Sequence, residues 1–162
     1  MNWMAAPMTT SPLPRVQLAL NVDDLDAAVD FYSRLLGVSA AKRRPGYANF
    51  AVAEPPLKLV LLENPGQGGT LNHLGVEVGS TAEVAGATRR LAEQGLPTEL
   101  EDGVTCCHAL QDKVWATAPD GERWEVYTVL ADTPEGTTHD GRPMLDLQTA
   151  SSSASSGSIC CG

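Results

Sequence analysis

The sequence is poor in positive charge: 11 lysine and arginine residues stand against 20 aspartate and glutamate residues, for a formal net charge of −9 over 162 residues. An acidic surface repels the phosphates of nucleic acids, so the charge balance argues against a nucleic-acid partner. The sequence also has no apolar run long enough to span a bilayer, which argues against a membrane-spanning helix.

The N-terminal stretch lacks the marks of a signal peptide, because residues 1–8 hold no basic region and no apolar core. We therefore predict a cytoplasmic protein in a reducing environment. Cysteine is scarce, and the four cysteines form two adjacent pairs, Cys106–Cys107 and Cys160–Cys161. Adjacent pairs are not the spacing of a disulfide framework. They favour the binding of a soft ion or metalloid, or redox sensing.

The pair Cys106–Cys107 is the most distinctive feature of the sequence. Thiolate is a soft ligand that selects thiophilic partners, and it is also a candidate nucleophile when its pKa is lowered. Adjacent side chains of a regular strand point to opposite faces. Both thiols can grip one atom only if the backbone there forms a bend, bulge or loop. The alternative reading is two ordinary cysteines, one buried and one exposed.

The sequence repeats one pattern of elements. Residues 16–22 and 71–78 both alternate apolar and other residues with a period of two, which predicts two strands. They align at an offset of 56 residues (73 − 17 = 56), so Gln17 and His73 occupy equivalent positions. Each half then reads as strand, helix and three further strands. Such a repeat predicts two βαβββ modules with a cleft between their curved sheets.

Helix signals follow both of these strands. Asp23-Asp24 offers an N-cap for a helix over residues 25–36, and Gly37 is placed to end it. Ser80-Thr81-Ala82-Glu83 is a capping-box signature for a second helix, which Gly95 ends. The remaining strands are predicted near residues 39–43, 48–53, 57–63, 98–101, 113–117 and 123–129.

The flanking segments differ from the repeat in composition. Residues 1–14 are rich in Pro and Thr, and residues 131–162 are polar and contain a Ser-rich run. We predict a disordered extension over the first segment and a flexible tail over the second, ending in the second cysteine pair. The domain between them spans residues 15–130, with modules at about residues 15–64 and 70–130.

The strand faces that point away from the helices line the predicted cleft. Gln17 and His73 lie on those faces, and the period of two adds Glu125 if Trp124 and Val126 pack on a helix. One imidazole, one carboxylate and one amide make a three-ligand site with open positions, suited to Fe(II), Mn(II), Ni(II), Co(II) or Zn(II). Each residue also has an ordinary reading: a hydrogen-bonding glutamine, a polar strand histidine and a solvated glutamate.

Two further residues, Tyr47 and Lys113, are candidates for the cleft, and no local pattern decides between a role in the cleft and a structural role. Lys42-Arg43-Arg44 forms a small basic cluster. It reads either as an attraction for an anionic substrate or as a solvated edge.

Several motifs between residues 15 and 130 resemble one branch of the vicinal oxygen chelate superfamily, which includes glyoxalases, extradiol dioxygenases and fosfomycin or bleomycin resistance proteins. The branch is that of the organoarsenical C–As lyases and the similar cadmium-induced proteins. The motifs that carry the resemblance are RVQLAL (15–20), PGYANF (45–50), PLKLVL (56–61), NHLGVEV (72–78), TCC (105–107), QDKVW (111–115) and ERWEVY (122–127).

The resemblance implies an α+β vicinal oxygen chelate fold, with two βαβββ modules and a cleft between curved mixed sheets. It implies Fe(II)- and O2-dependent cleavage of the carbon–arsenic bond of trivalent methyl or aryl arsenicals, with release of inorganic arsenite. Gln17, His73 and Glu125 match the metal positions of the branch, and Cys106 and Cys107 match its arsenic-binding thiols. Many superfamily members have histidine where Gln17 stands, so other divalent metals stay open.

Two alternatives stand beside a lyase. One is a cytosolic protein that binds Cd(II) or As(III) without turnover. The other is a different vicinal oxygen chelate enzyme, glyoxalase-like or dioxygenase-like, although the adjacent thiols argue against chemistries that use a thiol cosubstrate. Cys160 and Cys161 would either capture a metalloid and pass it inward or end a passive tail. Monomer and homodimer both stay open.

Overall fold

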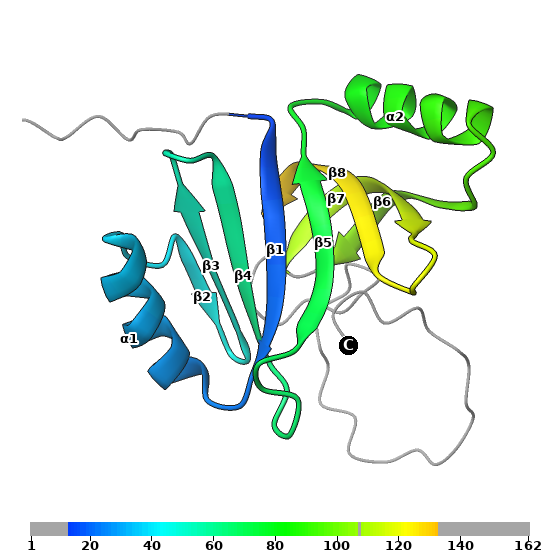
Figure 1. The fold of residues 1–162 in the computed structure, drawn as a ribbon. Helices are drawn as coiled ribbons and strands as arrows, with labels where there is room; N and C mark the ends of the chain where they lie inside the picture. Colours follow the sequence, from blue (N-terminus) through cyan, green and yellow to red (C-terminus); the bar gives the residue numbers. More distant parts are fainter. Residues whose placement is uncertain (1–12, 107, 133–162) are drawn as a thin grey trace, which may run out of the picture.

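A computed structural model describes residues 13–106 and 108–132 of the chain. Within them, eight strands and two helices follow one another in the order predicted from the repeat (Figure 1). The elements are β1 (Arg15–Val22), α1 (Leu25–Leu36), β2 (Lys42–Arg44), β3 (Tyr47–Val52), β4 (Leu57–Glu63), β5 (Leu71–Glu77), α2 (Thr81–Glu93), β6 (Thr98–Cys106), β7 (Ala109–Thr117) and β8 (Arg123–Asp132).

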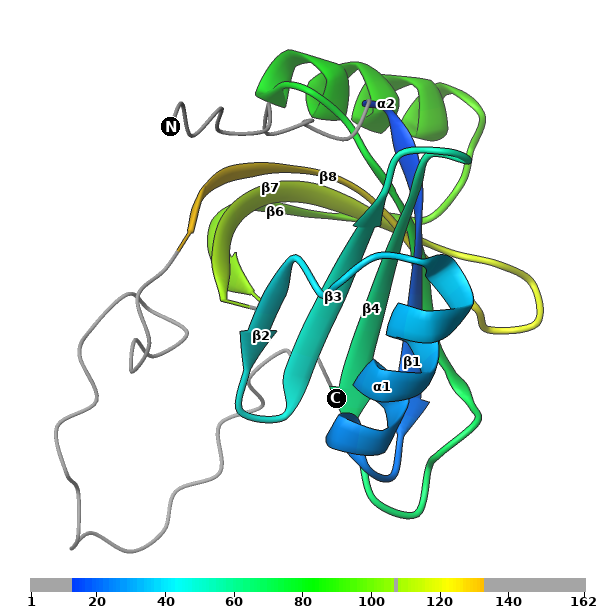
Figure 2. The same ribbon diagram turned by 90° about the vertical axis from the view of Figure 1, so that its left-hand side faces the viewer.

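All eight strands join one curled sheet in the order β2-β3-β4-β1-β5-β8-β7-β6. The two predicted modules meet where β1 pairs antiparallel with β5, which sets Gln17 opposite Gly75 and Ala19 opposite His73. Each of these central strands also pairs in parallel with the last strand of its own module. Figure 2 shows the sheet bending so that β6, β7 and β8 arch over the face of β2 and β3. The predicted α+β fold of two βαβββ modules is confirmed, with the two sheets joined edge to edge.

The helices cover the convex face of the sheet, as the strand patterns predicted. Asp24 caps α1 by accepting a hydrogen bond from the backbone N–H of Ala27 at 2.9 Å. The apolar core between α1 and the sheet contains Leu25 of the helix with Ala48, Phe50, Leu59 and Leu61, joined by Leu18, Leu20 and Val22. A second core under α2 contains Val84, Ala87 and Val114, joined by Val126. The opposite faces of β1, β5 and β8 are thereby turned into the concavity.

The structure corrects several predicted strand ends. The strand predicted at residues 39–43 is β2, which begins only at Lys42, because just three of its residues pair with β3. β6 runs to Cys106, well past the predicted end at residue 101. Its register against β7 shifts between Glu101 and Val104. A bulge of this kind lets a strand bend without leaving its partner.

A tight reversal joins β6 to β7. β6 ends at Cys106 and β7 begins at Ala109, its register partner, while His108 adopts the left-handed conformation with φ 64°. A bend between Cys106 and Cys107, which binding of one atom by both thiols would need, stays a prediction, because β6 ends at Cys106 and Cys107 is not described. Cys107, Cys160 and Cys161 lie outside the described residues, as do most of the predicted extension and tail. Neither described helix is long and apolar enough to cross a membrane.

Candidate metal and substrate site

The three predicted metal ligands converge on the concave face. Gln17, His73 and Glu125 come from the adjacent strands β1, β5 and β8, and their exposed fractions are only 3%, 4% and 3%. The Nε2 atom of Gln17 lies 3.1 Å from Nε2 of His73 and donates to Oε1 of Glu125 at 2.7 Å. The third side of the triangle, from His73 Nε2 to Glu125 Oε1, measures 3.3 Å.

This spacing fits three ligands of one metal ion. Two bonds of about 2.1 Å that meet at a right angle place their donor atoms about 3.0 Å apart. The observed separations of 2.7–3.3 Å bracket that value. Among the residues that the structure describes, no three His, Cys, Asp or Glu side chains gather into a metal-binding group. The candidate centre therefore depends on Gln17 as its third donor.

His73 is oriented by its neighbour in the chain. Its Nδ1 atom lies 2.7 Å from the side-chain oxygen Oδ1 of Asn72, which only accepts hydrogen bonds. The other ring nitrogen, Nε2, faces Gln17 and Glu125, and it is the atom that a metal ion would bind. The ring edge packs on Trp115, with centroids 5.4 Å apart. Such partners fix the tautomer and rotation of a metal-binding imidazole.

Glu125 divides its two oxygens between the centre and a buried lysine. Oε1 faces Gln17 and His73, whereas Oε2 accepts a salt bridge from Lys113 Nζ at 2.9 Å. Burial raises the pKa of Glu125, but the hydrogen bond with His73 and the charges of Lys113 and His73 outweigh it and hold the pKa at about 2. Glu125 is therefore a carboxylate at neutral pH, with one oxygen available to the centre. Lys113, a predicted auxiliary residue, reaches the site.

Gln17 is held from behind by Tyr127. The Tyr127 hydroxyl donates to Oε1 of Gln17, and the tyrosine is fully buried. In this orientation the amide nitrogen faces the centre, and a metal ion would need the amide oxygen there. A half-turn of the amide exchanges the two atoms, and the Tyr127 oxygen can then accept from Nε2. The donor set thus fits a divalent metal once the amide is turned.

Gly75 makes room for this convergence. A Cβ atom at Gly75 would lie 2.9 Å from Cγ of Glu125, 3.2 Å from the backbone oxygen of Glu125 and 3.4 Å from Nε2 of Gln17. Real Cβ atoms avoid contacts that short. A residue without a side chain is therefore needed for the carboxylate and the amide to meet across β5.

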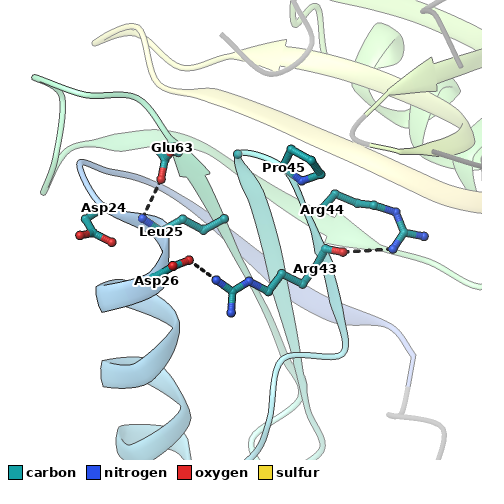
Figure 3. Close-up of a pocket in the computed structure, with 8 residues that line it drawn as sticks. Asp24, Leu25, Asp26, Arg43, Arg44, Pro45 and Glu63 are labelled. Atoms are coloured by element: carbon teal, nitrogen blue, oxygen red, sulfur yellow. Dashed lines mark hydrogen bonds and ion pairs between the residues drawn. The ribbon is translucent and has the colours of Figure 1, made fainter. Parts of the chain in front are cut away.

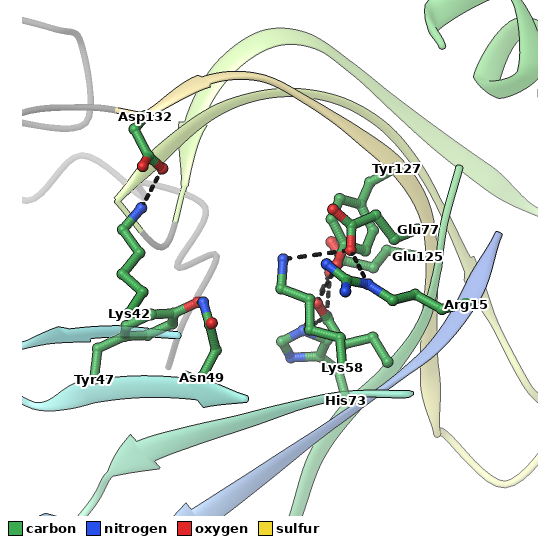
Figure 4. A network of polar contacts seen from close by, with 11 residues as sticks. Arg15, Lys42, Tyr47, Asn49, Lys58, His73, Glu77, Glu125, Tyr127 and Asp132 are labelled. Carbon is green, nitrogen blue, oxygen red and sulfur yellow. Dashed lines mark hydrogen bonds and ion pairs between the residues drawn. The ribbon is translucent and has the colours of Figure 1, made fainter. Parts of the chain in front are cut away.

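A cavity of about 220 Å³ lies beside the centre, between the two modules. Its walls include Tyr47, Asn49 and Lys58 on one side and Gln111 and Val129 on the other. Figure 4 shows the polar groups on both sides, with Arg15, Lys58 and Glu77 next to His73, Glu125 and Tyr127, and Lys42 and Asp132 across the gap.

Tyr47, the other predicted auxiliary residue, therefore lies in the cavity wall. Its hydroxyl accepts a hydrogen bond from Asn49 Nδ2 at 2.8 Å, and its ring packs against the ring of His108. Tyr47 thus joins the cavity wall to the turn that follows Cys106.

The turn between β6 and β7, which follows Cys106, is hydrogen-bonded to the first module. Ala109, the register partner of Cys106, lines the cavity. Lys42 Nζ donates to the backbone oxygen of His108 at 2.7 Å and to Oδ1 of Asp132 at 2.5 Å. The end of β6 therefore lies at the edge of the cavity. Lys42, from the predicted basic cluster, serves an internal contact.

A larger hollow, of about 570 Å³, lies away from this site at the N-terminus of α1 (Figure 3). Two contacts cross it: Arg43 donates to Asp26, and Glu63 accepts from the backbone N–H of Leu25 at 2.8 Å. These contacts tie β2 and β4 to the start of the helix. The hollow is an open surface depression between fastened elements, and it holds none of the predicted site residues.

Sequence reasoning did not assign Asn72, Lys58, Tyr127 and Gln111 to the site. Two of them carried a readable signal: Tyr127 shares the strand face of Glu125, and Lys58 is the one charged residue inside the apolar run LKLVLL (57–62). Asn72 and Gln111 carried none, because their roles depend on contacts that the period of a strand does not reveal.

Comparison with known proteins gives one consistent family. The family model described as Glyoxalase/Bleomycin resistance protein/Dioxygenase superfamily matches residues 15–126. The chain is 72% identical over 121 residues to the cadmium-induced protein CadI of Mycobacterium tuberculosis, covering 75% of this chain and 80% of the relative. It is 52% identical over 151 residues to the trivalent organoarsenical cleaving enzyme of Thermomonospora curvata, covering 92% of this chain and 100% of that enzyme.

Among solved structures, the homoprotocatechuate 2,3-dioxygenase of Arthrobacter globiformis has the same fold. The TM-score is 0.53 at 22% identity, and the match covers 79% of this chain but only 41% of the dioxygenase. With these relatives and the geometry above, the chain belongs to the Glyoxalase/Bleomycin resistance protein/Dioxygenase superfamily, in its branch of cadmium-induced proteins and trivalent organoarsenical cleaving enzymes.

Proposed function

We propose that the chain cleaves the carbon–arsenic bond of trivalent organoarsenicals, using Fe(II) and O2 and releasing inorganic arsenite. The observation that carries the proposal is the triangle of Gln17, His73 and Glu125 beside a cavity whose edge holds Cys106. The 52% identity to an enzyme named for this cleavage supports it. Methyl and aryl arsenicals are the proposed substrate class.

Oε1 of Gln17, Nε2 of His73 and Oε1 of Glu125 would hold the metal ion. An iron(II) ion with open positions supplies the binding and activation of O2. Lys113 keeps the carboxylate of Glu125 charged and turned with one oxygen inward. Asn72 keeps the His73 lone pair facing the centre. Burial of all three ligands excludes bulk water from the reacting atoms.

Cys106 and Cys107 would hold the arsenic. A trivalent arsenical with one organic group has two exchangeable hydroxyl groups. Two thiols replace them with release of two water molecules, so that two As–S bonds form and the carbon–arsenic bond remains. The arsenic is then fixed at the cavity edge with its organic group directed by the walls. Holding the bond in one place contributes to rate by positioning.

A second candidate function is binding of Cd(II) or As(III) without turnover. The observation that favours it is the 72% identity to a protein named for induction by cadmium. Binding of a soft ion would need the thiols of Cys106 and Cys107 and no metal at the buried triangle.

The test is anaerobic reconstitution with Fe(II), followed by methylarsenite and O2, with arsenic species separated by chromatography and detected by mass. We expect arsenite only when both iron and O2 are present, and none from a Cys106→Ser variant. Tight thiol-dependent binding without arsenite would favour the second candidate. Normal cleavage by Cys106→Ser would contradict the anchoring role of the thiols.

A further inference from the structure

The loop that joins β4 to β5 passes beside the end of β1 (Figure 1) and is bonded there to Asn21. The backbone N–H of Asn21 donates to the Thr70 carbonyl at 2.9 Å, and its carbonyl accepts from the Gly69 N–H at 3.1 Å. Asn21 is buried, and its side chain makes three hydrogen bonds with the described residues. One of these bonds leads toward His73, a candidate metal ligand.

A backbone carbonyl sets the direction of these bonds. Thr70 Oγ1 lies 2.7 Å from the backbone oxygen of Gln67, which can only accept a hydrogen bond. The single hydroxyl proton of Thr70 is used there, so the Thr70 oxygen can only accept from Asn21, 2.9 Å away. An asparagine amide has one donating and one accepting end, and its partners decide which end faces which way. Asn21 therefore turns Nδ2 to Thr70 and Oδ1 to its other neighbours.

The remaining bonds carry this direction to His73. Oδ1 of Asn21 accepts from Nδ2 of Asn64 at 2.7 Å and from Nδ2 of Asn72 at 3.0 Å. Because Nδ2 of Asn72 faces Asn21, Oδ1 of Asn72 faces Nδ1 of His73, at 2.7 Å. An oxygen that only accepts requires an N–H at Nδ1, and the neutral ring then has its lone pair on Nε2. Gln17 agrees with this assignment, because its Nε2 donor lies 3.1 Å from Nε2 of His73 and needs an acceptor there.

The amide relay is the chain of side chains Thr70, Asn21 and Asn72 that starts at the Gln67 carbonyl. We infer that the amide relay keeps the proton of His73 on Nδ1 and so presents a lone pair, rather than an N–H, to the metal ion. The inference rests on the proposed function for that metal ion. Thr70 is the deciding residue: if its hydroxyl donated to Asn21 instead, both amides could reverse together and His73 would carry its proton on Nε2.

The test measures the tautomer of His73 in the metal-free, full-length chain with isotope-labelled histidine. The nitrogen chemical shifts of the imidazole distinguish a protonated ring nitrogen from a bare one, at a pH where the ring is neutral. The chain has three histidines, so the signals of His73 are identified by comparison with His108→Asn and His139→Asn. We expect the unaltered chain to carry the proton on Nδ1 of His73. Titration with Mn(II) then gives the metal affinity.

Two pairs of variants separate the amide relay from ordinary packing. Thr70→Val removes the deciding hydroxyl at an exposed position, whereas Thr70→Ser keeps it. Asn21→Leu removes the acceptor for Asn72, whereas Asn21→Asp keeps it. We expect Thr70→Val and Asn21→Leu to give a mixture of tautomers, with Mn(II) affinity lower by about two- to tenfold. Thr70→Ser and Asn21→Asp should keep the tautomer of the unaltered chain.

The outcomes separate the inference from the proposed function. A proton on Nε2 of His73 in the unaltered chain overturns the inference, and so does one tautomer shared by all four variants. A loss of stability in Thr70→Val or Asn21→Leu without a change of tautomer would mean that these side chains only hold the loop. If the unaltered chain has the expected tautomer but the iron-loaded protein releases no arsenite, the proposed cleavage fails and the amide relay stands, because the tautomer is measured without metal.

Discussion

The two modules have the same order of elements, but matched positions of their last strands, β4 and β8, carry side chains of opposite character. The registers against β4 and β8 match their residues in pairs: Ala19 pairs with Val60 in the first module, and Gly75 pairs with Glu125 in the second. Two positions further along, the partner is Leu62 in the first module and Tyr127 in the second.

In the first module these positions form a buried apolar cluster of Ala19, Tyr47, Val60 and Leu62. In the second module the same backbone positions present a carboxylate and a phenol. At these positions the repeat therefore supplies an inert wall, the apolar cluster of the first module, and a reactive wall, Glu125 and Tyr127 of the second. The first module still contributes Gln17 to the candidate centre, so the two copies share the site although they differ at these positions.

The largest effect on this difference between the modules is expected from removing the carboxylate of Glu125. Glu125→Gln keeps the shape of the side chain but removes the one anionic ligand of the candidate centre. We expect affinity for Fe(II) or Mn(II) to fall by at least about 100-fold and arsenite production to stop, with arsenical binding kept. Anaerobic metal titration and product analysis measure the two effects.

The matched control is the counterpart in the first module, Val60→Ala. It deletes two buried methyl groups, so the free energy of unfolding should fall by about 1–3 kcal/mol. Metal affinity should stay unchanged, because Val60 belongs to the inert wall. Unchanged turnover in Glu125→Gln would refute the assignment of the metal site.

A second comparison uses the buried lysines of the two modules, Lys58 on β4 and Lys113 on β7. Lys113 lies 2.9 Å from Glu125, whereas Lys58 lies 3.8 Å from Glu77, which already has Arg15 at 2.7 Å. Burial lowers the pKa of Lys58, with the charge of Glu77 opposing it. The charge of Lys58 is therefore held weakly.

Lys113→Met should lower the free energy of unfolding by about 3 kcal/mol, because it leaves Glu125 buried without its cation. Lys58→Met should cost about 1 kcal/mol or less, since Glu77 keeps Arg15. Urea unfolding of both variants gives the values. Equal losses would show that the ion pair of Lys113 has no special weight.

The repeat explains how much of the site the sequence could predict. Period-two alternation placed Gln17, His73 and Glu125 on the faces away from the helices, and the offset of 56 residues made the first two equivalent (73 − 17 = 56). They converge because β1, β5 and β8 are neighbours in the sheet, an order that results from parallel and antiparallel strand pairing. The sequence alone predicts on which face of its strand each residue lies, whereas the fold shows which of these faces come together.

The remainder depends on contacts between distant segments. Cys106 was predicted beyond the end of its strand, but pairing with Ala109 extends β6 to it. Gln111 lies where the register of β7 against β8 shifts, and no local pattern signals that shift. Tyr47 and Lys113 looked alike as candidates, and only the curvature of the sheet put one in the cavity wall and the other against Glu125.

Gly75 and Ala19 occupy equivalent positions in the two modules and differ by one atom, the Cβ. The first module has room for a Cβ at this position, which Ala19 carries. In the second module, a Cβ at Gly75 would lie 2.9 Å from Cγ of Glu125. Gly75→Ala should therefore push the carboxylate out of line and weaken metal binding by about tenfold. Its thermal stability should change little, because the side chain of Glu125 can give way. A stability loss without a change in metal affinity would contradict this account.

The smallest effect is expected at Tyr127, whose counterpart Leu62 has no hydroxyl. Tyr127→Phe removes the donor to Gln17 Oε1 and keeps the ring volume. The amide of Gln17 then loses the partner that holds it in either orientation. We expect metal affinity to fall by about three- to tenfold, for a net hydrogen bond of about 1 kcal/mol.

A structural loss alone would not give that pattern. If Tyr127 acts by orienting the amide, Tyr127→Phe should have no further effect on metal affinity in a Gln17→Ala background, where the amide is absent. The double-mutant comparison by metal titration measures this directly. Additive losses would mean that Tyr127 supports the centre by a route other than Gln17. Packing, rather than this hydrogen bond, would then set the ligand geometry of the reactive wall.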